Sequence, residues 1–156
     1  MSNADRIEKQ VVLRAPRPRV WKAIADHDEF GSWFGVKWAG PFVAGQRNVA
    51  VFQMPGYEGR EMEVWVDAVE PETRFSYRWH PNAIDESVDY SAEPTTLVEF
   101  RLEDAAGGTR LTVTESGFEG VPVSRRLDAF RGNSEGWGIQ MERIANYVDG
   151  VASARA

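Results

Sequence analysis

Alternating hydrophobic and polar positions predict a run of β-strands along most of the chain. A period of two is typical of a strand with one buried face. The predicted strands are residues 7–13, 48–54, 61–69, 75–79, 98–102 and 111–115. Turn-forming residues separate them, including a predicted hairpin turn at residues 106–108. Short connections of this kind favour antiparallel neighbours.

Two segments near the N-terminus carry helical periodicity instead. Residues 18–25 predict a short amphipathic helix with Pro18 in its first turn, where proline is tolerated. We expect residues 27–29 to break this helix. A further helical turn is predicted around Phe30, Trp33 and Phe34, ended by Gly35.

The C-terminal part predicts one long helix. Apolar residues recur there at intervals of three and four from Leu127 to Val148, a stripe that includes Trp137 and Met141. Ser124 is predicted as its N-cap. Gly132, Gly136 and Gly138 weaken the helix, and one reason to keep glycine there is a close approach of the helix to the sheet or to a ligand.

These elements predict an α+β fold of the helix-grip type. A one-sided sheet must cover its apolar face, and the long C-terminal helix is the only sizeable cover available. We therefore expect a curved antiparallel β-sheet wrapped around that helix, with the two short N-terminal helices at one end. The length of 156 residues fits a single domain, 1–156, with its core at about 6–150.

Composition narrows the function classes. The formal net charge of −6 argues against a nucleic-acid partner, which would need clustered Lys and Arg. The chain has no cysteine, so Cys-ligated clusters and disulfides are excluded, and we expect a cytoplasmic protein without a cofactor. We also expect no signal peptide and no membrane span, because no apolar stretch is long enough.

Several segments in this order resemble a known superfamily. They are residues 20–24 (VWKAI), 30–35 (FGSWFG), 40–45, 107–118 (GGTRLTVTESGF) and 133–137 (NSEGW). Together they resemble the START-like (SRPBCC, Bet v 1-like) superfamily, and within it the bacterial proteins similar to the activator of the heat-shock-protein-90 ATPase. The resemblance extends over roughly the whole chain and implies a helix-grip fold that encloses a ligand cavity.

The aromatic residues are unusually numerous and are the first candidates for a functional site. The chain has 6 Trp, 8 Phe and 4 Tyr. Such rings either fill the core or line a pocket for an apolar or aromatic ligand. The residues predicted to line this pocket are Trp33, Phe34, Trp38, Phe52, Val64, Tyr77, Trp79, Phe100, Glu115, Trp137 and Met141.

Glu115 is the most unusual of these because alternation turns it inward, on the face of Leu111 and Val113. A buried carboxylate needs partners. It could bond a ligand, act as a general base with a raised pKa, or pair with Arg101, and near the strand end it could instead be exposed to solvent. Tyr77 is a second candidate polar anchor.

The remaining polar groups suggest less chemistry. His27 and His80 have no partner histidine at a metal-ligand spacing, so we predict no metal site. The acidic segment 85–93 could close over a pocket or be a solvated loop. Arg125, Arg126 and Arg131 are expected on the exposed side of the last helix.

Three functions fit the sequence. The first is binding of a small hydrophobic or aromatic molecule in a cavity between sheet and helix. The second is a cyclase-, dehydratase- or hydrolase-type enzyme that uses the same cavity, with Glu115 and Tyr77 as its polar pair. The third, implied by the resemblance, is a co-chaperone-like interaction domain. An exposed sheet edge could also support a homodimer.

Overall fold

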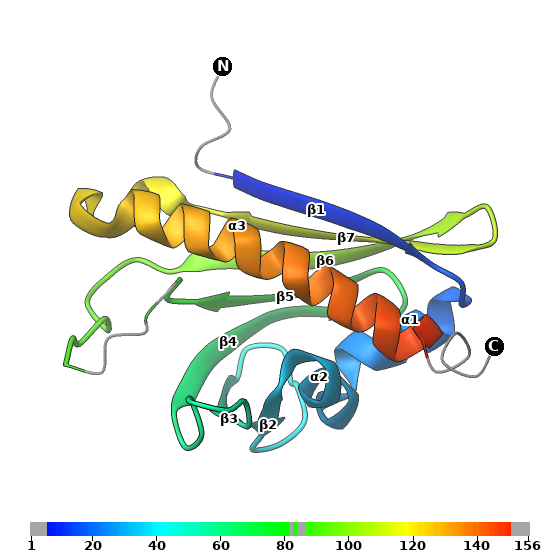
Figure 1. Cartoon of the computed structure of the whole chain (residues 1–156), viewed down its shortest axis with the longest axis horizontal. Helices are drawn as coiled ribbons and strands as arrows, with labels where there is room; N and C mark the ends of the chain where they lie inside the picture. Colours follow the sequence, from blue (N-terminus) through cyan, green and yellow to red (C-terminus); the bar gives the residue numbers. More distant parts are fainter. Residues whose placement is uncertain (1–5, 82, 84–86, 151–156) are drawn as a thin grey trace.

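A seven-stranded antiparallel sheet curves around one long helix, as the hydrophobic pattern predicts (Figure 1). The computed structural model describes residues 6–81, 83 and 87–150. In chain order the elements are β1 (Arg6–Leu13), α1 (Arg17–Ala25), α2 (His27–Phe34), β2 (Val36–Trp38), β3 (Arg47–Phe52), β4 (Glu61–Glu70), β5 (Arg74–Trp79), β6 (Thr96–Ala105), β7 (Gly108–Ser116), the short 3-10 helix η1 (Phe118–Gly120), α3 (Val123–Ala145) and the π-helical turn η2 (Asn146–Gly150).

The strand order β1-β7-β6-β5-β4-β3-β2 makes β1 and β2 the two edges. The register shifts between Val66 and Ala68, where the Ser76 hydroxyl accepts a hydrogen bond from the Ala68 amide at 3.2 Å. Such a bulge increases the local twist and helps the sheet to curve. The hairpin between β6 and β7 is confirmed, with Ala105 paired to Gly108.

The long helix α3 crosses the concave face of the sheet, and α1 and α2 lie together at one end (Figure 1). The first part of α3 was predicted less well than its middle. Pro122, not Ser124, precedes its first residue, and no side chain caps it. Leu127 is 57% exposed, so its place in the buried stripe is wrong. The first buried residue of the helix is Ala129.

The two short helices are separate, but the break is one residue earlier than predicted. Asp26 caps α2, with its carboxylate accepting from the Asp28 amide at 3.1 Å. Residues 27–29 therefore form the first turn of α2, where acidic residues favour the helix N-terminus. Gly35 ends α2 as predicted, with φ at 91°. The short strand β2, which directly follows, was not predicted.

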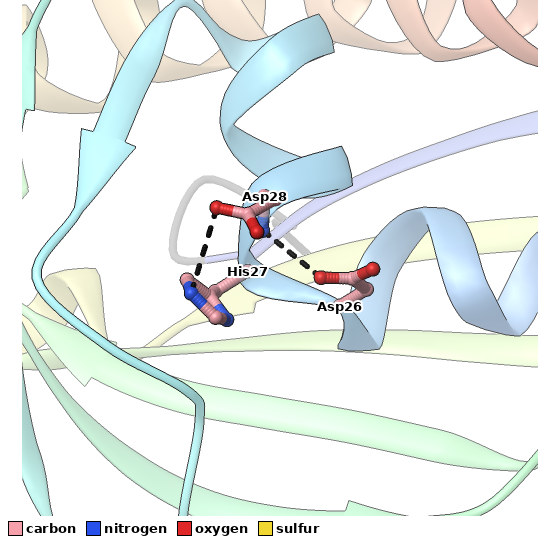
Figure 2. Close-up of side chains that lie close together, drawn as sticks. All are labelled: Asp26, His27 and Asp28. Carbon is pink, nitrogen blue, oxygen red and sulfur yellow. Dashed lines mark hydrogen bonds and ion pairs between the residues drawn. The ribbon is translucent and has the colours of Figure 1, made fainter.

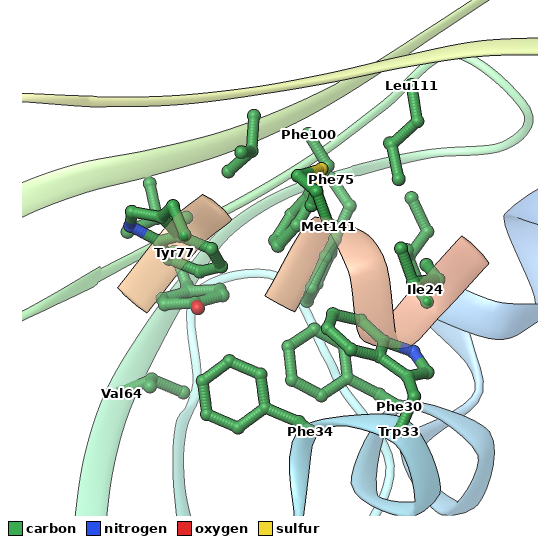
Figure 3. Close-up of a cluster of buried hydrophobic side chains, with 14 of the residues drawn as sticks. Ile24, Phe30, Trp33, Phe34, Val64, Phe75, Tyr77, Phe100, Leu111 and Met141 are labelled. Carbon is green, nitrogen blue, oxygen red and sulfur yellow. The ribbon is translucent and has the colours of Figure 1, made fainter. Parts of the chain in front are cut away.

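Aromatic rings fill much of the space between the sheet and the helices (Figure 3). The ring of Phe30 on α2 joins several of them: its centroid lies 4.6 Å from that of Trp33, 6.0 Å from Phe100 and 6.5 Å from Tyr77. Edge-to-face and offset contacts of this kind stabilise a core beyond the area that they bury. The N-terminal helix pair is thus tied to the centre of the sheet.

Candidate functional site

A buried carboxylate with only neutral partners lies between the sheet and α3. Glu115 on β7 is 0% exposed, which confirms its predicted inward orientation. Its Oε1 accepts from the indole nitrogen of Trp137 at 2.8 Å and from the Asn133 amide at 2.9 Å. Its Oε2 accepts from the Trp79 indole at 2.8 Å, the Thr96 hydroxyl at 2.5 Å and the Asn133 amide at 3.1 Å. We call Glu115 and these four donor residues the Glu115 cluster.

The elements that supply the cluster explain its place in the fold. Glu115, Thr96 and Trp79 come from β7, β6 and β5, and Asn133 and Trp137 are one helical turn apart on α3. A carboxylate has about four lone-pair positions, and the four donor groups, with the Asn133 amide shared between both oxygens, occupy them. The cluster therefore joins α3 to three strands, and it leaves Glu115 no free acceptor position for a ligand.

Two of the predicted surroundings of Glu115 are wrong. Arg101 does not pair with it, because Arg101 lies on the exposed face of β6 and forms an ion pair with Glu99. Solvent exposure near the strand end is also wrong, because the two tryptophan rings and α3 cover the carboxylate. Alternation assigns a residue to a face but does not show what covers that face.

Tyr77 is a second unusual polar group on the same face. It is 0% exposed, and among the described residues its hydroxyl has no hydrogen-bond partner. Burial raises the pKa of the Tyr77 phenol well above its usual value, and the negative charge of Glu115 raises it further. The hydroxyl is therefore a neutral donor, and an unpaired buried donor costs about 1–3 kcal/mol.

The surroundings of this hydroxyl are apolar. The Tyr77 ring lies 5.3 Å from the ring of Trp79 and 5.9 Å from that of Phe75, centroid to centroid. Figure 3 shows its oxygen on the side of the cluster where Val64 and Phe34 project. The chain thus holds a hydrogen-bond donor within a group of hydrophobic side chains.

Three inward side chains near one end of β3, β4 and β5 are only partly buried. They are Phe52, Met62 and Trp79, whereas Ala50, Val64 and Tyr77, the next inward positions along the same strands, are buried. The register staggers these three residues along the sheet, because Met62 pairs with Ala50 and Trp65 with Arg78. We call Phe52, Met62 and Trp79 the rim.

The helices face this rim from the other side. The Phe34 ring, at the end of α2, lies 6.5 Å from Trp79 and 6.1 Å from Trp137. The Phe34 carbonyl accepts from Arg143 at 3.2 Å, which links α2 to α3. The Gln140 side-chain oxygen is buried and also lacks a partner among the described residues.

Open space adjoins α3 beside its glycines. A Cβ placed on Gly136 or Gly138 would have no heavy atom within 4 Å. The prediction that these two glycines permit a close approach of the helix to the sheet is therefore wrong, and a close approach to a ligand stays a prediction.

Among the other predicted pocket residues, Trp33 and Trp38 lie toward the N-terminal helices and β2, whereas Phe100 lies beside Tyr77 and Trp137, with ring centroids 6.3 and 5.7 Å apart. Trp33 donates to the Ala23 carbonyl at 2.8 Å and so joins α2 to α1. Trp38 on β2 lies against Phe42 at 4.9 Å, and its indole nitrogen is buried without a partner among the described residues. Phe100 is fully buried in the aromatic cluster. Their place in the pocket stays a prediction.

Met141 belongs to the buried cluster of Figure 3 and also borders a surface recess. A surface recess of about 330 Å³ between β1 and α3 is lined by Lys9, Gln10, Val11, Gly138, Met141, Glu142, Ala145 and Asn146. This recess is open and partly polar, and it contains no aromatic side chain. Tyr77 is not among the residues that line it.

Three consecutive residues at the start of α2 could geometrically hold a cation (Figure 2). The ligand atoms of Asp26, His27 and Asp28 lie within 4.8 Å of one another, and His27 Nε2 is 3.5 Å from Asp28 Oδ1. However, Asp26 is already the N-cap, and the positive end of a helix disfavours a cation. The arrangement is explained by capping, and the absence of a metal site stays a prediction.

The acidic loop before β6 is tied to α3. Arg125 bonds the Glu93 carboxylate at 2.7 Å and the Pro81 carbonyl at 2.9 Å, and its guanidinium lies over the Tyr90 ring. The Arg125 side chain is only 19% exposed, so its predicted place on the solvent side of the helix is wrong. Asp85 and Glu86 of this predicted segment lie outside the described residues.

Sequence reasoning missed two members of the Glu115 cluster, Thr96 and Asn133. A signal existed for both. Thr96 is two residues before Val98, so a period of two places it on the inward face, and Asn133 precedes Trp137 by one helical turn. What joins them to Glu115 is the pairing of strands and helix, which no local pattern reveals.

A curved antiparallel sheet that grips a C-terminal helix around a polar and aromatic interior defines the helix-grip, START-like class of domain. A family model described as "Activator of Hsp90 ATPase homolog 1-like protein" matches residues 14–149. The chain therefore belongs to this family, as its sequence resemblance predicted.

Solved structures agree with this fold. DynU16, a protein of the dynemicin biosynthetic locus, is 28% identical with a TM-score of 0.73, and the match covers 93% of this chain and 47% of that chain. MLL2253 from Mesorhizobium loti is 23% identical with a TM-score of 0.71, covering 92% of this chain and 96% of that one. The Aha1 dimer from Colwellia psychrerythraea is 17% identical with a TM-score of 0.68, covering 92% and 96%.

A search of curated proteins gives no match. Among the described residues, no helix is both long and apolar enough to span a bilayer.

Proposed function

We propose that this protein binds a small hydrophobic or aromatic molecule between the concave face of the sheet and α3. The observation that carries the proposal is the Tyr77 hydroxyl, fully buried among aromatic rings without a partner in the described chain. Unpaired buried groups are rare in native proteins and call for an explanation. A ligand that enters over the rim and bonds Tyr77 supplies one.

The composition of the surroundings supports the same conclusion. Ligand sites are mostly apolar with a few polar groups that fix orientation. Val64 and the rim offer the apolar surface, and Tyr77 offers one unpaired donor. Because Phe34 lies against Trp79 and Trp137, entry of a ligand requires this ring to move aside.

The alternatives have less support. Enzymatic use of Glu115 as a general base would first require one of its four donors to leave, because they occupy its lone pairs. The co-chaperone reading rests on the family name, with Val123 and Leu127 as exposed apolar side chains on α3. A homodimer through the edge strand β1 and a cytoplasmic location are further parts of the proposal.

Native mass spectrometry of the purified full chain tests the proposed binding. We expect a co-purified small molecule, or a stoichiometric adduct after addition of naphthalene. Met62→Trp narrows the entrance at the rim and should reduce the bound fraction, whereas Val43→Trp, at a site already 42% exposed, should not. No adduct with any apolar aromatic probe would contradict the proposal.

A further inference from the structure

Tyr77 and Glu115 occupy the same row of the sheet. Tyr77 pairs with Val98 on β6, and Val98 pairs with Glu115 on β7, so all three side chains share the inward face. Strands are spaced by about 4.8 Å, which places the Cα atoms of Tyr77 and Glu115 about 10 Å apart along this row. Trp79 lies next to both, with its ring 5.3 Å from Tyr77 and its indole nitrogen bonded to Glu115.

The two groups differ in what they offer to a ligand. The Tyr77 hydroxyl can still donate a hydrogen bond, because burial and the nearby charge raise its pKa and keep it protonated. Glu115 accepts from two indoles, an amide and a hydroxyl, so no cation in the Glu115 cluster neutralises it. A ligand near Tyr77 therefore meets a hydrogen-bond donor and a fixed negative charge.

This combination of a donor and a negative charge favours uncharged ligands over anionic ones. For a ligand charge on the order of 10 Å from the Glu115 carboxylate, an effective dielectric constant near 20 makes the repulsion between two negative charges cost roughly tenfold in affinity. An oxygen without charge escapes this repulsion and still accepts from Tyr77. One hydrogen bond in such an environment changes affinity by roughly fivefold.

We infer that the ligand of this site is an uncharged, largely apolar molecule with a carbonyl-type oxygen that accepts a hydrogen bond from the Tyr77 hydroxyl. This inference rests on the proposed function and adds the chemical class of the ligand. Carboxylates and phenolates of the same shape are disfavoured by the charge of Glu115.

Three probes of similar shape test the inference: 2-acetylnaphthalene, 2-ethylnaphthalene and 2-naphthoate. Their dissociation constants are measured by NMR titration of the tryptophan indole N–H signals of the full chain. We expect the ketone to bind about fivefold more tightly than the hydrocarbon. It should bind about tenfold more tightly than the anion.

Tyr77→Phe removes only the hydroxyl and should bring the ratio of ketone to hydrocarbon affinity to about one. The matched control Tyr57→Phe changes a tyrosine that is 45% exposed and should keep the wild-type ratio. Equal binding of ketone and hydrocarbon by the wild type, or a ratio that survives in Tyr77→Phe, would overturn the inference while leaving the proposed function intact. If none of the three probes binds, the proposed function fails and the inference fails with it.

Discussion

The Glu115 cluster makes a sharp prediction for Glu115→Gln, which removes the charge and keeps the shape. Glutamine offers one carbonyl oxygen and one NH₂ group in place of two oxygens. Trp137 donates to one oxygen of Glu115 and Trp79 to the other. Because an indole nitrogen can only donate, one of the two must face the new NH₂ group whichever way the amide turns.

The magnitude follows from that mismatch. The Asn133 amide and the Thr96 hydroxyl can rotate to accept, but one indole N–H is left buried without a partner. An unsatisfied buried donor costs about 1–3 kcal/mol, and the remaining bonds lose their charge-assisted strength. We expect Glu115→Gln to lower the free energy of unfolding by about 2–4 kcal/mol, a large share of the stability of a typical domain.

Urea unfolding followed by far-UV circular dichroism measures this loss without relying on tryptophan fluorescence. The matched control is Glu103→Gln on the exposed side of β6, which should change stability by less than about 0.5 kcal/mol. Trp79→Phe removes one donor, so the glutamine can turn its NH₂ group toward position 79 without a clash. Glu115→Gln should therefore cost less in the Trp79→Phe background, a non-additivity of about 1 kcal/mol or more.

A small effect would refute this reasoning. If Glu115→Gln and Glu103→Gln unfold at the same urea concentration, the five contacts do not hold α3 to the sheet. Additive losses in the double variant would likewise show that Trp79 and Glu115 are not coupled.

Three further predictions concern other parts of the fold. The pKa of Tyr77 is raised in the folded state, so this residue contributes stability that is complete below the unfolded pKa of 10.0 and is lost as the pH rises toward the higher folded pKa. Above about pH 10, urea titrations should show the wild type losing up to about 1.4 kcal/mol of stability per pH unit more than Tyr77→Phe. Parallel curves for the two proteins would contradict this. Gly136→Ala should stabilise the protein by about 0.5–1 kcal/mol in thermal unfolding. Gly31→Ala should destabilise it, because the new Cβ would lie 2.3 Å from the Val36 carbonyl oxygen. A change of stability in the same direction for both variants would contradict the packing. Arg125→Met should destabilise the protein by about 1–3 kcal/mol and speed hydrogen exchange at the Glu93 amide, relative to the exposed control Arg131→Met. Unchanged exchange at this amide would show that Arg125 does not fix the loop.

The hydrophobic pattern predicted most of the helices and strands because each of them is amphipathic along its whole length. It missed β2, where Val36 and Trp38 give only one repeat of the alternation. It placed Leu127 in the buried stripe because periodicity continues through the first turns of α3. The side chains of these first turns are not buried, because α3 begins at Val123 and its first buried residue is Ala129.

The candidate site could be predicted only in part. Alternation along β7 turned Glu115 inward, and alternation along β5 did the same for Tyr77. The partners of Glu115 come from strands and a helix that are distant in sequence, so they depend on register and on the crossing of α3. The unpaired state of Tyr77 is likewise a property of its neighbours and not of its own strand.

The most direct test of the account is a crystal structure of the full chain grown with 2-acetylnaphthalene. We predict that the probe lies inside the rim beside Val64 and Phe34, with its oxygen about 2.7–3.0 Å from the Tyr77 hydroxyl. A chain that excludes the probe, or holds it only in the recess between β1 and α3 beside Lys9 and Met141, would contradict the account.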